Sequence, residues 1–383
     1  MLIDHIPPGV ILFFIFYGVT GVVPLIAAFY LLLRRGNAIA PGVTSPLRLR
    51  RWTAAFFAVL TLAHVWWLLF YIYSGDLQSV SCMVLAMADC VLLFTTFAGM
   101  LLAMLQDRCR PVWPALVAVI PFVALAVVYM VNPSSLLEQF AAGYLVLLGL
   151  LFTGYMVFAI RQYGHWLNDN YADLENKKVW LSQAVSLVCM LLFVLYVLAS
   201  NMVLIWFIHV FEFVLVVLLL WRVETLPQLD SISTEEETEE TSVAPAPETE
   251  AEVIPTQVQI TSSNLANIDL AQIEQLLTEH CATTQLYLQH DLSLQQLART
   301  IGTNRSYLSQ YFSRQGITYN TYINNLRINY FISRYQEVAS TQQPFTVKQL
   351  VSESGYHSYS TFSLAFKQRM GQSVTAWMHD TTE

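Results

Sequence analysis

The fold of the C-terminal region is decided by residues 355–371, which read GYHSYSTFSLAFKQRMG. Phe362 and Phe366 stand four residues apart, a spacing that places two side chains on one face of a helix. The other positions are mostly small, polar or basic, and such a face suits the major groove of DNA. Gly355 precedes this helix, where a left-handed residue lets the chain turn sharply. The stretch therefore predicts the second helix of a helix-turn-helix unit.

The same order of features occurs 53 residues earlier in the chain. Ser293 and Gln296 have the spacing of a capping box, in which each side chain bonds the backbone of the other at a helix start. Gly302 ends that helix, and Leu308 and Phe312 form the apolar pair of the next one. The sequence thus predicts two helix-turn-helix units, at about 292–315 and 345–370, joined by one long apolar-faced helix from Tyr319 to about Ala339.

These motifs resemble the DNA-binding domain of the AraC/XylS family of transcriptional regulators, in particular the membrane-embedded members found in Bacteroidetes-type bacteria. The resemblance covers about 100 residues, Ile273 to Trp377, and its most specific stretch is G-Y-x-S-x-S-x-F-S-x-x-F-K-x-x-x-G-x-S at 355–373. It implies two recognition helices entering successive major grooves of double-stranded promoter DNA. It also implies RNA polymerase as a partner. One tail would then read an asymmetric site, and a homodimer remains an alternative.

The resemblance also assigns contacts to individual positions. The residues that it places at base edges are Arg305, Ser306, Ser309 and Gln310 in the first unit, and Tyr359, Ser360, Thr361, Ser363 and Leu364 in the second. The residues that it places at phosphates are Arg314, His357, Ser358 and Lys367. The chain departs from the family pattern twice, because Gly316 follows Phe312 after four positions instead of five and because Leu364 stands where a polar reader is usual.

The charge of this region favours binding to an anionic polymer. Residues 292–370 contain eight Lys and Arg residues but only two acids, Glu337 and Glu353. Contacts between these bases and phosphates release counterions, so we expect DNA binding to weaken with salt.

The rest of the chain has the composition of a membrane protein. Hydrophobic residues make up 55% of the sequence and charged residues only 12%, which excludes a purely soluble protein. Apolar runs of bilayer-spanning length lie near 9–33, 52–73, 81–105, 112–131, 141–160, 179–199 and 202–221, with a hairpin turn at Ser200 and Asn201. No basic segment precedes the first run, so we expect it to stay in the membrane rather than act as a removable signal peptide. The predicted fold class is all-α, a seven-helix transmembrane bundle plus a cytoplasmic domain with two helix-turn-helix units.

The orientation follows from the basic residues. All 11 Lys and Arg residues of 1–222 fall on alternate connections or directly after the seventh run. Positive residues mark the cytoplasmic side, so the N-terminus is predicted outside and the C-terminus in the cytoplasm. The predicted location is the bacterial cytoplasmic (inner) membrane.

The sequence divides into three predicted domains. Residues 1–222 form the seven-span region and 264–383 the DNA-binding domain. Residues 223–263 contain 10 acids and no base, a composition that predicts a disordered acidic linker.

Four ionisable residues lie inside the predicted spans, where an unpaired charge is costly: His64, Asp89, His209 and Glu212. His209 and Glu212, three residues apart, share a helix face. These residues are candidates for sensing a small molecule or a membrane signal. Polar packing between helices and a metal or haem site remain alternatives, but no metal-type spacing is present, so the sequence predicts no metal and no cofactor.

No motif of phosphate binding, hydrolysis or metalloprotease chemistry is present, so no catalytic residue is predicted. The sequence therefore favours a membrane-anchored one-component transcriptional regulator rather than an enzyme. Two alternatives stay open. One is a transporter or membrane enzyme with an autoregulatory DNA-binding tail, and the other is an anchor that releases its tail by proteolysis.

Overall fold

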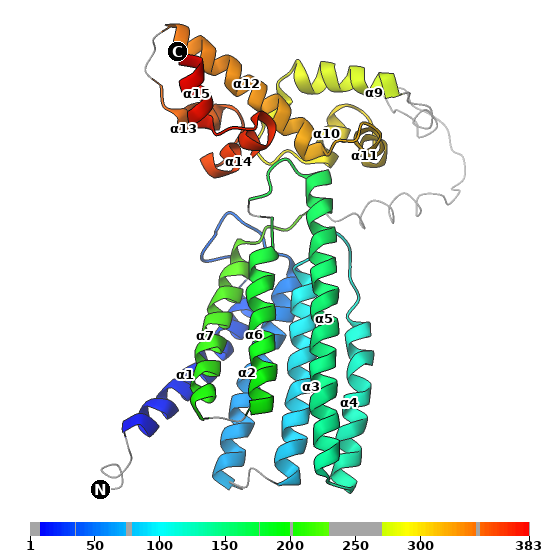
Figure 1. Cartoon of the computed structure of the whole chain (residues 1–383), viewed down its shortest axis with the longest axis vertical. Helices are drawn as coiled ribbons and strands as arrows, with labels where there is room; N and C mark the ends of the chain where they lie inside the picture. The colour runs from blue at the N-terminus through cyan, green and yellow to red at the C-terminus, as the bar shows by residue number, and fades with distance from the viewer. Residues whose placement is uncertain are drawn as a thin grey trace, which may run out of the picture. The chain divides into compact units, whose positions relative to one another are not determined.

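The structure is a computed structural model that describes residues 8–34, 36–73, 79–175, 177–199, 202–229, 270–341 and 345–382 (Figure 1). These residues are helical or irregular and form no strand beyond one isolated bridge between Tyr171 and Ser293. The all-α prediction is confirmed for them. The chain divides into two compact units. The helical bundle comprises Met1–Tyr163 and Val179–Glu237, and the C-terminal unit comprises Gly164–Lys178 and Thr238–Glu383.

The described part of the helical bundle contains seven helices at the positions of the seven predicted spans. Their bounds are α1 Pro8–Leu33, α2 Leu47–Tyr73, α3 Val80–Ala103, α4 Trp113–Val131, α5 Ser135–Asn170, α6 Trp180–Ala199 and α7 Met202–Thr225. Five of them, α1 to α5, are long and apolar enough to cross a membrane. Since α6 and α7 are only partly described, a total of seven spans stays a prediction. The predicted turn at Ser200 and Asn201 lies outside the described residues.

The outer surface of the bundle is apolar. On α1 the side chains of Val22, Ile26, Phe29 and Leu33 are all exposed, and Leu33 is 78% exposed. Their spacing of three and four residues forms a continuous stripe along one face of the helix. Such a stripe is unfavourable in water and favourable in lipid, which is consistent with membrane association.

A buried polar network joins α1, α2 and α7 at one end of the bundle. Arg50 lies 3.4 Å from Glu224, and both side chains are almost fully buried. Tyr30 donates a hydrogen bond to the same carboxylate, and Asn37 donates to the Glu224 carbonyl oxygen. Arg50 therefore holds helices together, a role that the orientation count did not anticipate.

Two boundaries differ from the sequence analysis. Helix α5 extends ten residues beyond the predicted span, and Gly164–Lys178 folds with the C-terminal unit instead of the membrane region. The predicted linker starts at Val223, whereas α7 continues to Thr225 and Leu226 and Leu229 are buried. Their apolar side chains explain the difference, because packing compensates for the chain entropy lost. Residues 230–269 lie outside the described residues.

The C-terminal unit is built from short helices around one long one. These are α9 Leu270–Leu277, α10 Leu294–Thr300, α11 Arg305–Arg314, α12 Tyr319–Thr341, α13 Val347–Glu353, α14 Tyr359–Met370 and α15 Val374–Thr382. Figure 1 shows α12 as the long helix of this unit. Two helix pairs, α10–α11 and α13–α14, correspond to the two predicted repeats, and α12 is the predicted connecting helix.

Side-chain caps start the helices of both pairs. The Ser293 hydroxyl accepts from the Gln296 amide while the Gln296 side chain accepts from the Ser293 amide, so the predicted capping box is confirmed. Ser358 accepts from the amide of Thr361 at the start of α14. Between the helices of each pair the chain turns at a left-handed glycine, Gly302 with φ 73° and Gly355 with φ 85°.

Two apolar cores form along α12, whose N-terminal part contributes to the first and whose following part contributes to the second. The first contains Leu308 and Phe312, and the second contains Phe362 and Phe366. Each of these four side chains is at most 3% exposed, which confirms the predicted apolar pairs. Both helix pairs therefore pack against the same connecting helix.

Candidate nucleic-acid interface

The first candidate surface is the polar face of α11. Asn304 caps this helix by accepting a hydrogen bond from the amide of Tyr307, and Leu308 and Phe312 turn inward. The opposite face presents the predicted contact residues to solvent. Ser306, Ser309, Gln310 and Arg314 are exposed, whereas Arg305 is half-buried. The face thus carries hydroxyl, amide and guanidinium groups, which can donate to or accept from base edges and phosphates.

The second candidate surface is the corresponding face of α14. His357, Tyr359, Ser360 and Lys367 are exposed. Ser358, Thr361 and Ser363 are half-buried, and Leu364 is 55% exposed. Phe362 and Phe366 are buried on the inner face of α14. Their packing opposes rotation of the helix about its axis and keeps these polar side chains on the outer face.

Several predicted contact residues are engaged by Gly164–Lys178, a segment of the same unit. Asn170 accepts a hydrogen bond from Arg305 Nε at 2.8 Å. Glu175 accepts from the hydroxyls of Ser358 at 2.5 Å and Thr361 at 2.7 Å. A carboxylate therefore occupies a position at the start of α14 that a DNA phosphate could also occupy.

A buried ion pair anchors this segment. Arg327 of α12 is completely buried, and its guanidinium bonds both carboxylate oxygens of Asp173 at 2.9 and 3.3 Å. The same guanidinium donates to the carbonyl oxygens of Tyr287 and Gln289. Each of the three guanidinium nitrogens of Arg327 donates a hydrogen bond, so its buried charge and that of Asp173 are compensated. Ala172, 1% exposed, completes the attachment by packing into the first core.

A second charged group surrounds Asp291. Lys177 lies 2.7 Å from this carboxylate, and His357 Nε2 lies 2.9 Å from its other oxygen. Desolvation raises the pKa of Asp291, but the hydrogen bonds and charges of Lys177 and His357 outweigh it and hold the pKa below its ordinary value. His357, predicted to contact phosphate, also stacks on His290 with 4.5 Å between ring centroids.

Not every base counted in the sequence is available to DNA. Arg327 forms an ion pair with Asp173, and Arg334 forms ion pairs with Glu337 and Glu353. Arg369 donates a hydrogen bond to Asn329. Desolvation lowers the pKa of Arg369, with Tyr356 acting in the opposite direction. The count of eight bases therefore overstates the number of phosphate contacts, and the salt dependence should be correspondingly weaker.

The predicted site residues do not include Asn170, Asp173, Glu175 or Lys177. Lys177 contributed only to the predicted membrane orientation, and the other three had no predicted role. A signal was present, because the connection between the fifth and sixth predicted spans is rich in polar and acidic residues. Nothing in that local pattern specifies a partner more than 100 residues away.

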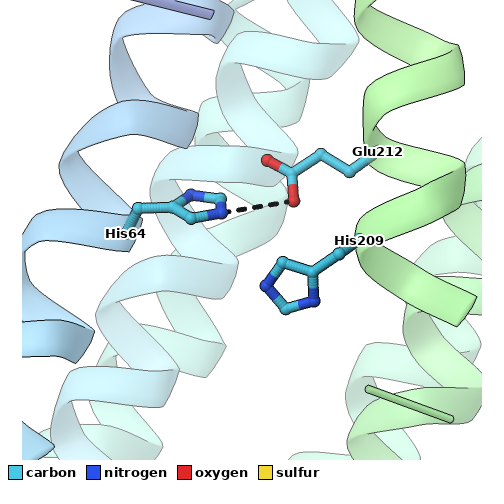
Figure 2. Close-up of side chains that lie close together, drawn as sticks. All are labelled: His64, His209 and Glu212. Atoms are coloured by element: carbon cyan, nitrogen blue, oxygen red, sulfur yellow. Dashed lines mark ion pairs between the residues drawn. The ribbon is translucent and has the colours of Figure 1, made fainter. Parts of the chain in front are cut away.

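The four candidates in the predicted spans separate into two groups. His64 of α2 and His209 and Glu212 of α7 point toward one another, as Figure 2 shows, and their ligand-type atoms lie within 4.8 Å of one another. Asp89 of α3 lies elsewhere and accepts hydrogen bonds from the indoles of Trp66 and Trp67. Of the four candidates, only the first three form a cluster, and it lies within the helical bundle.

Residues 297–380 match a family model described as "Helix-turn-helix domain". The model is of the AraC type, so the match supports an AraC-family DNA-binding domain in this part of the chain. No curated protein and no solved structure matches the chain.

Proposed function

We propose that this protein is a membrane-anchored, one-component transcriptional regulator of the bacterial inner membrane, as in the membrane-embedded AraC/XylS members that it resembles. The helical bundle senses a signal, and the cytoplasmic C-terminal unit binds promoter DNA sequence-specifically through α11 and α14. Double-stranded DNA, the lipid bilayer and RNA polymerase are its proposed partners. Binding needs no phosphorelay and no cofactor.

The observation that carries this proposal is the matched construction of the two helix pairs. Each has a capped start, a left-handed glycine between its helices, an inward apolar pair and an outward polar face. The family match spans most of the first pair and all of the second. Helices of this kind, fixed to one α12, could enter successive major grooves from one face of the duplex.

Mapping of genomic sites bound by the full-length protein in its own membrane tests sequence-specific binding. We expect sharp peaks that share an asymmetric motif with two half-sites about one helical turn apart. The double variant Gln310→Ala and Ser360→Ala should lose those peaks. Binding that stays uniform along the chromosome would refute specific recognition.

The proposed topology is tested separately with a reporter enzyme fused after Glu383. A cytoplasm-active reporter should work and a periplasm-active reporter should not, because an odd number of spans places the two termini on opposite sides. A periplasm-active result would contradict access to the chromosome.

We infer that Gly164–Lys178 couples the bundle to DNA binding. This segment comprises the last turns of α5 and most of its connection to α6, yet it is anchored in the C-terminal unit by the Asp173–Arg327 pair. Its Glu175 and Asn170 hold Thr361, Ser358 and Arg305, which DNA would need. A signal that shifts the segment would release these groups, a population shift between two states of one contact.

The variant Glu175→Ala tests this coupling in the full-length protein. DNA affinity at fixed salt should rise roughly tenfold, since two hydrogen bonds to a charged acceptor no longer compete with DNA. Glu279→Ala is the matched control, because it removes the same charge from an exposed residue whose carboxylate accepts a hydrogen bond from Gln275, which is not a predicted DNA contact. Equal effects of the two variants would indicate general electrostatics and overturn the coupling.

A further inference from the structure

Three side chains with metal-binding atoms face one another inside the helical bundle (Figure 2). His64 Nε2 lies 3.6 Å from Glu212 Oε2, and the side chains of these two residues are 10% and 12% exposed. His209 is 9% exposed, and its ring packs against that of His64 with 5.6 Å between centroids. Two imidazoles and one carboxylate are thus enclosed together in an apolar region.

The orientation of His64 is fixed by hydrogen bonds. Its Nδ1 lies 2.8 Å from the carbonyl oxygen of Leu60, an acceptor only, so Nδ1 carries the proton. In the neutral ring the lone pair of Nε2 then points toward Glu212. A backbone carbonyl that fixes the far nitrogen in this way is the usual arrangement behind a metal-ligating histidine.

Protein groups alone leave this cluster incompletely satisfied. Thr20 Oγ1 lies 3.2 Å from His64 Nε2, but its single proton can be taken by the carbonyl oxygens of Phe16 and Tyr17 at 3.1 and 3.0 Å. Glu212 Oε1 is buried and has no hydrogen-bond partner among the described residues. The Nε2 lone pair of His64 faces the Glu212 carboxylate at 3.6 Å, and Glu212 Oε1 can still accept an interaction. Two electron-rich groups in this arrangement favour a cation between them.

We propose that His64, His209 and Glu212 bind one divalent transition-metal ion of the Zn²⁺ class. Imidazole and carboxylate ligands suit such ions, and two histidines with one glutamate are a recurring three-ligand set that leaves a fourth position open. Ligand atoms around a tetrahedral ion at about 2.0–2.2 Å are roughly 3.3–3.6 Å apart. The His64–Glu212 separation of 3.6 Å already falls at that limit, and the ligand-type atoms of all three residues lie within 4.8 Å of one another.

The surrounding helices shape the site. Gly21 of α1 approaches His64 closely, since a Cβ at this glycine would lie 3.1 Å from the His64 Cβ. The ring of Tyr17, also of α1, packs at a tilt against both histidine rings, and its hydroxyl donates a hydrogen bond to the carbonyl oxygen of His64. Helix α1 therefore covers the cluster and restricts the rotamers of the ligands.

The depth of the site suits an external metal. His209 lies seven residues from the start of α7 at Met202, about 10 Å along the helix. That end is the one predicted to face the outside. The fourth position, next to the Thr20 hydroxyl, could hold a water or a ligand that enters from there.

The other cluster with metal-type residues carries no such proposal. Asp173, Asp291 and His357 also lie close together, but Arg327 and Lys177 already pair with the two carboxylates. These cations occupy the positions that a metal ion would need.

Zinc binding to the full-length protein in detergent micelles or nanodiscs tests the proposal. The protein is stripped with a chelator, dialysed against buffered micromolar Zn²⁺ and analysed for metal by mass spectrometry. Wild type should retain one equivalent per chain, and His64→Ala, His209→Ala and Glu212→Gln should each lose it. Asp89→Asn and His357→Ala are the matched controls and should retain it, because neither residue belongs to the proposed site.

Replacement of Zn²⁺ by Co²⁺ gives a second readout that does not depend on folding of the variants. Co²⁺ in a tetrahedral site should produce visible absorption bands in wild type that added Zn²⁺ removes. Absence of these bands in wild type, or zinc retained equally by all five variants, overturns the site. Binding itself is independent of DNA recognition, and only the role of the metal as a signal rests on the proposed function. A reporter gene that responds to external Zn²⁺ in wild type and not in Glu212→Gln would support that role.

Discussion

The two helix pairs of the C-terminal unit are built from one pattern but differ in what surrounds their turns. Space around Gly302 is open, with nothing within 4 Å of an added Cβ. Around Gly355 it is filled, because an added Cβ would lie 2.7 Å from the Leu288 carbonyl oxygen and 3.0 Å from Arg327 Nε. The first glycine is required only for its backbone conformation, and the second also for its size. A repeat in sequence therefore does not imply equal tolerance to substitution.

The largest expected effect comes from the ion pair beside the second turn. Asp173→Ala should destabilise the C-terminal unit by about 3–5 kcal/mol, because it leaves the Arg327 charge buried without its partner. Protease protection of this unit in the full-length protein, measured against urea concentration, gives the change. Asp169→Ala, four residues away, is the control. A loss below about 1 kcal/mol would mean that Arg327 is supported by the Tyr287 and Gln289 carbonyls alone.

The two glycines give the next largest contrast. Gly355→Ala should cost about 3 kcal/mol, since a left-handed alanine is strained and its methyl group would displace backbone or Arg327. Gly302→Ala has the strain without the displacement and should cost about 1 kcal/mol. The same protease assay compares them. Equal losses would show that only the backbone conformation matters at both turns.

Substitutions on the two proposed recognition helices, α11 and α14, should have smaller effects than those at the glycines. We expect them to change DNA affinity rather than stability. Gln310→Ala on α11 should weaken binding roughly tenfold and relax specificity in one half-site only. Lys367→Ala on α14 should weaken binding to all sequences similarly and reduce the slope of log K against log salt by about 1. Titrations of the full-length protein at several salt concentrations separate these outcomes. A sequence-dependent loss for Lys367→Ala would contradict its assignment to phosphate.

The smallest difference concerns the caps. Ser293→Ala removes a capping box and should cost about 1 kcal/mol, whereas Thr346→Ala removes a single hydrogen bond to the Gln349 amide and should cost about half as much. Ser293→Thr and Thr346→Ser are the controls and should be close to neutral. A larger loss for Thr346→Ala would reverse the proposed order.

Most local features of the C-terminal unit could be predicted from the sequence. The capping box at Ser293, the left-handed Gly302 and Gly355, the buried pairs and the long α12 were all expected, and the structure has them. Each depends on residues a few positions apart, where helix geometry fixes which side chains meet. The contact residues on α11 and α14 stay predictions, because their exposure is described but their partner is not.

The sequence by itself determined the helical class of the described residues, a region of helices long and apolar enough to cross a membrane, and a tail with two capped helix pairs, because periodicity and caps are short-range properties. Only the tertiary structure decided that Asp173 meets Arg327, 154 residues away, and that His64 meets Glu212 across two helices. No repeating pattern in the sequence indicates which residues form these distant pairs. They form because a buried charge must find a partner, and packing of the whole unit decides which partner is within reach.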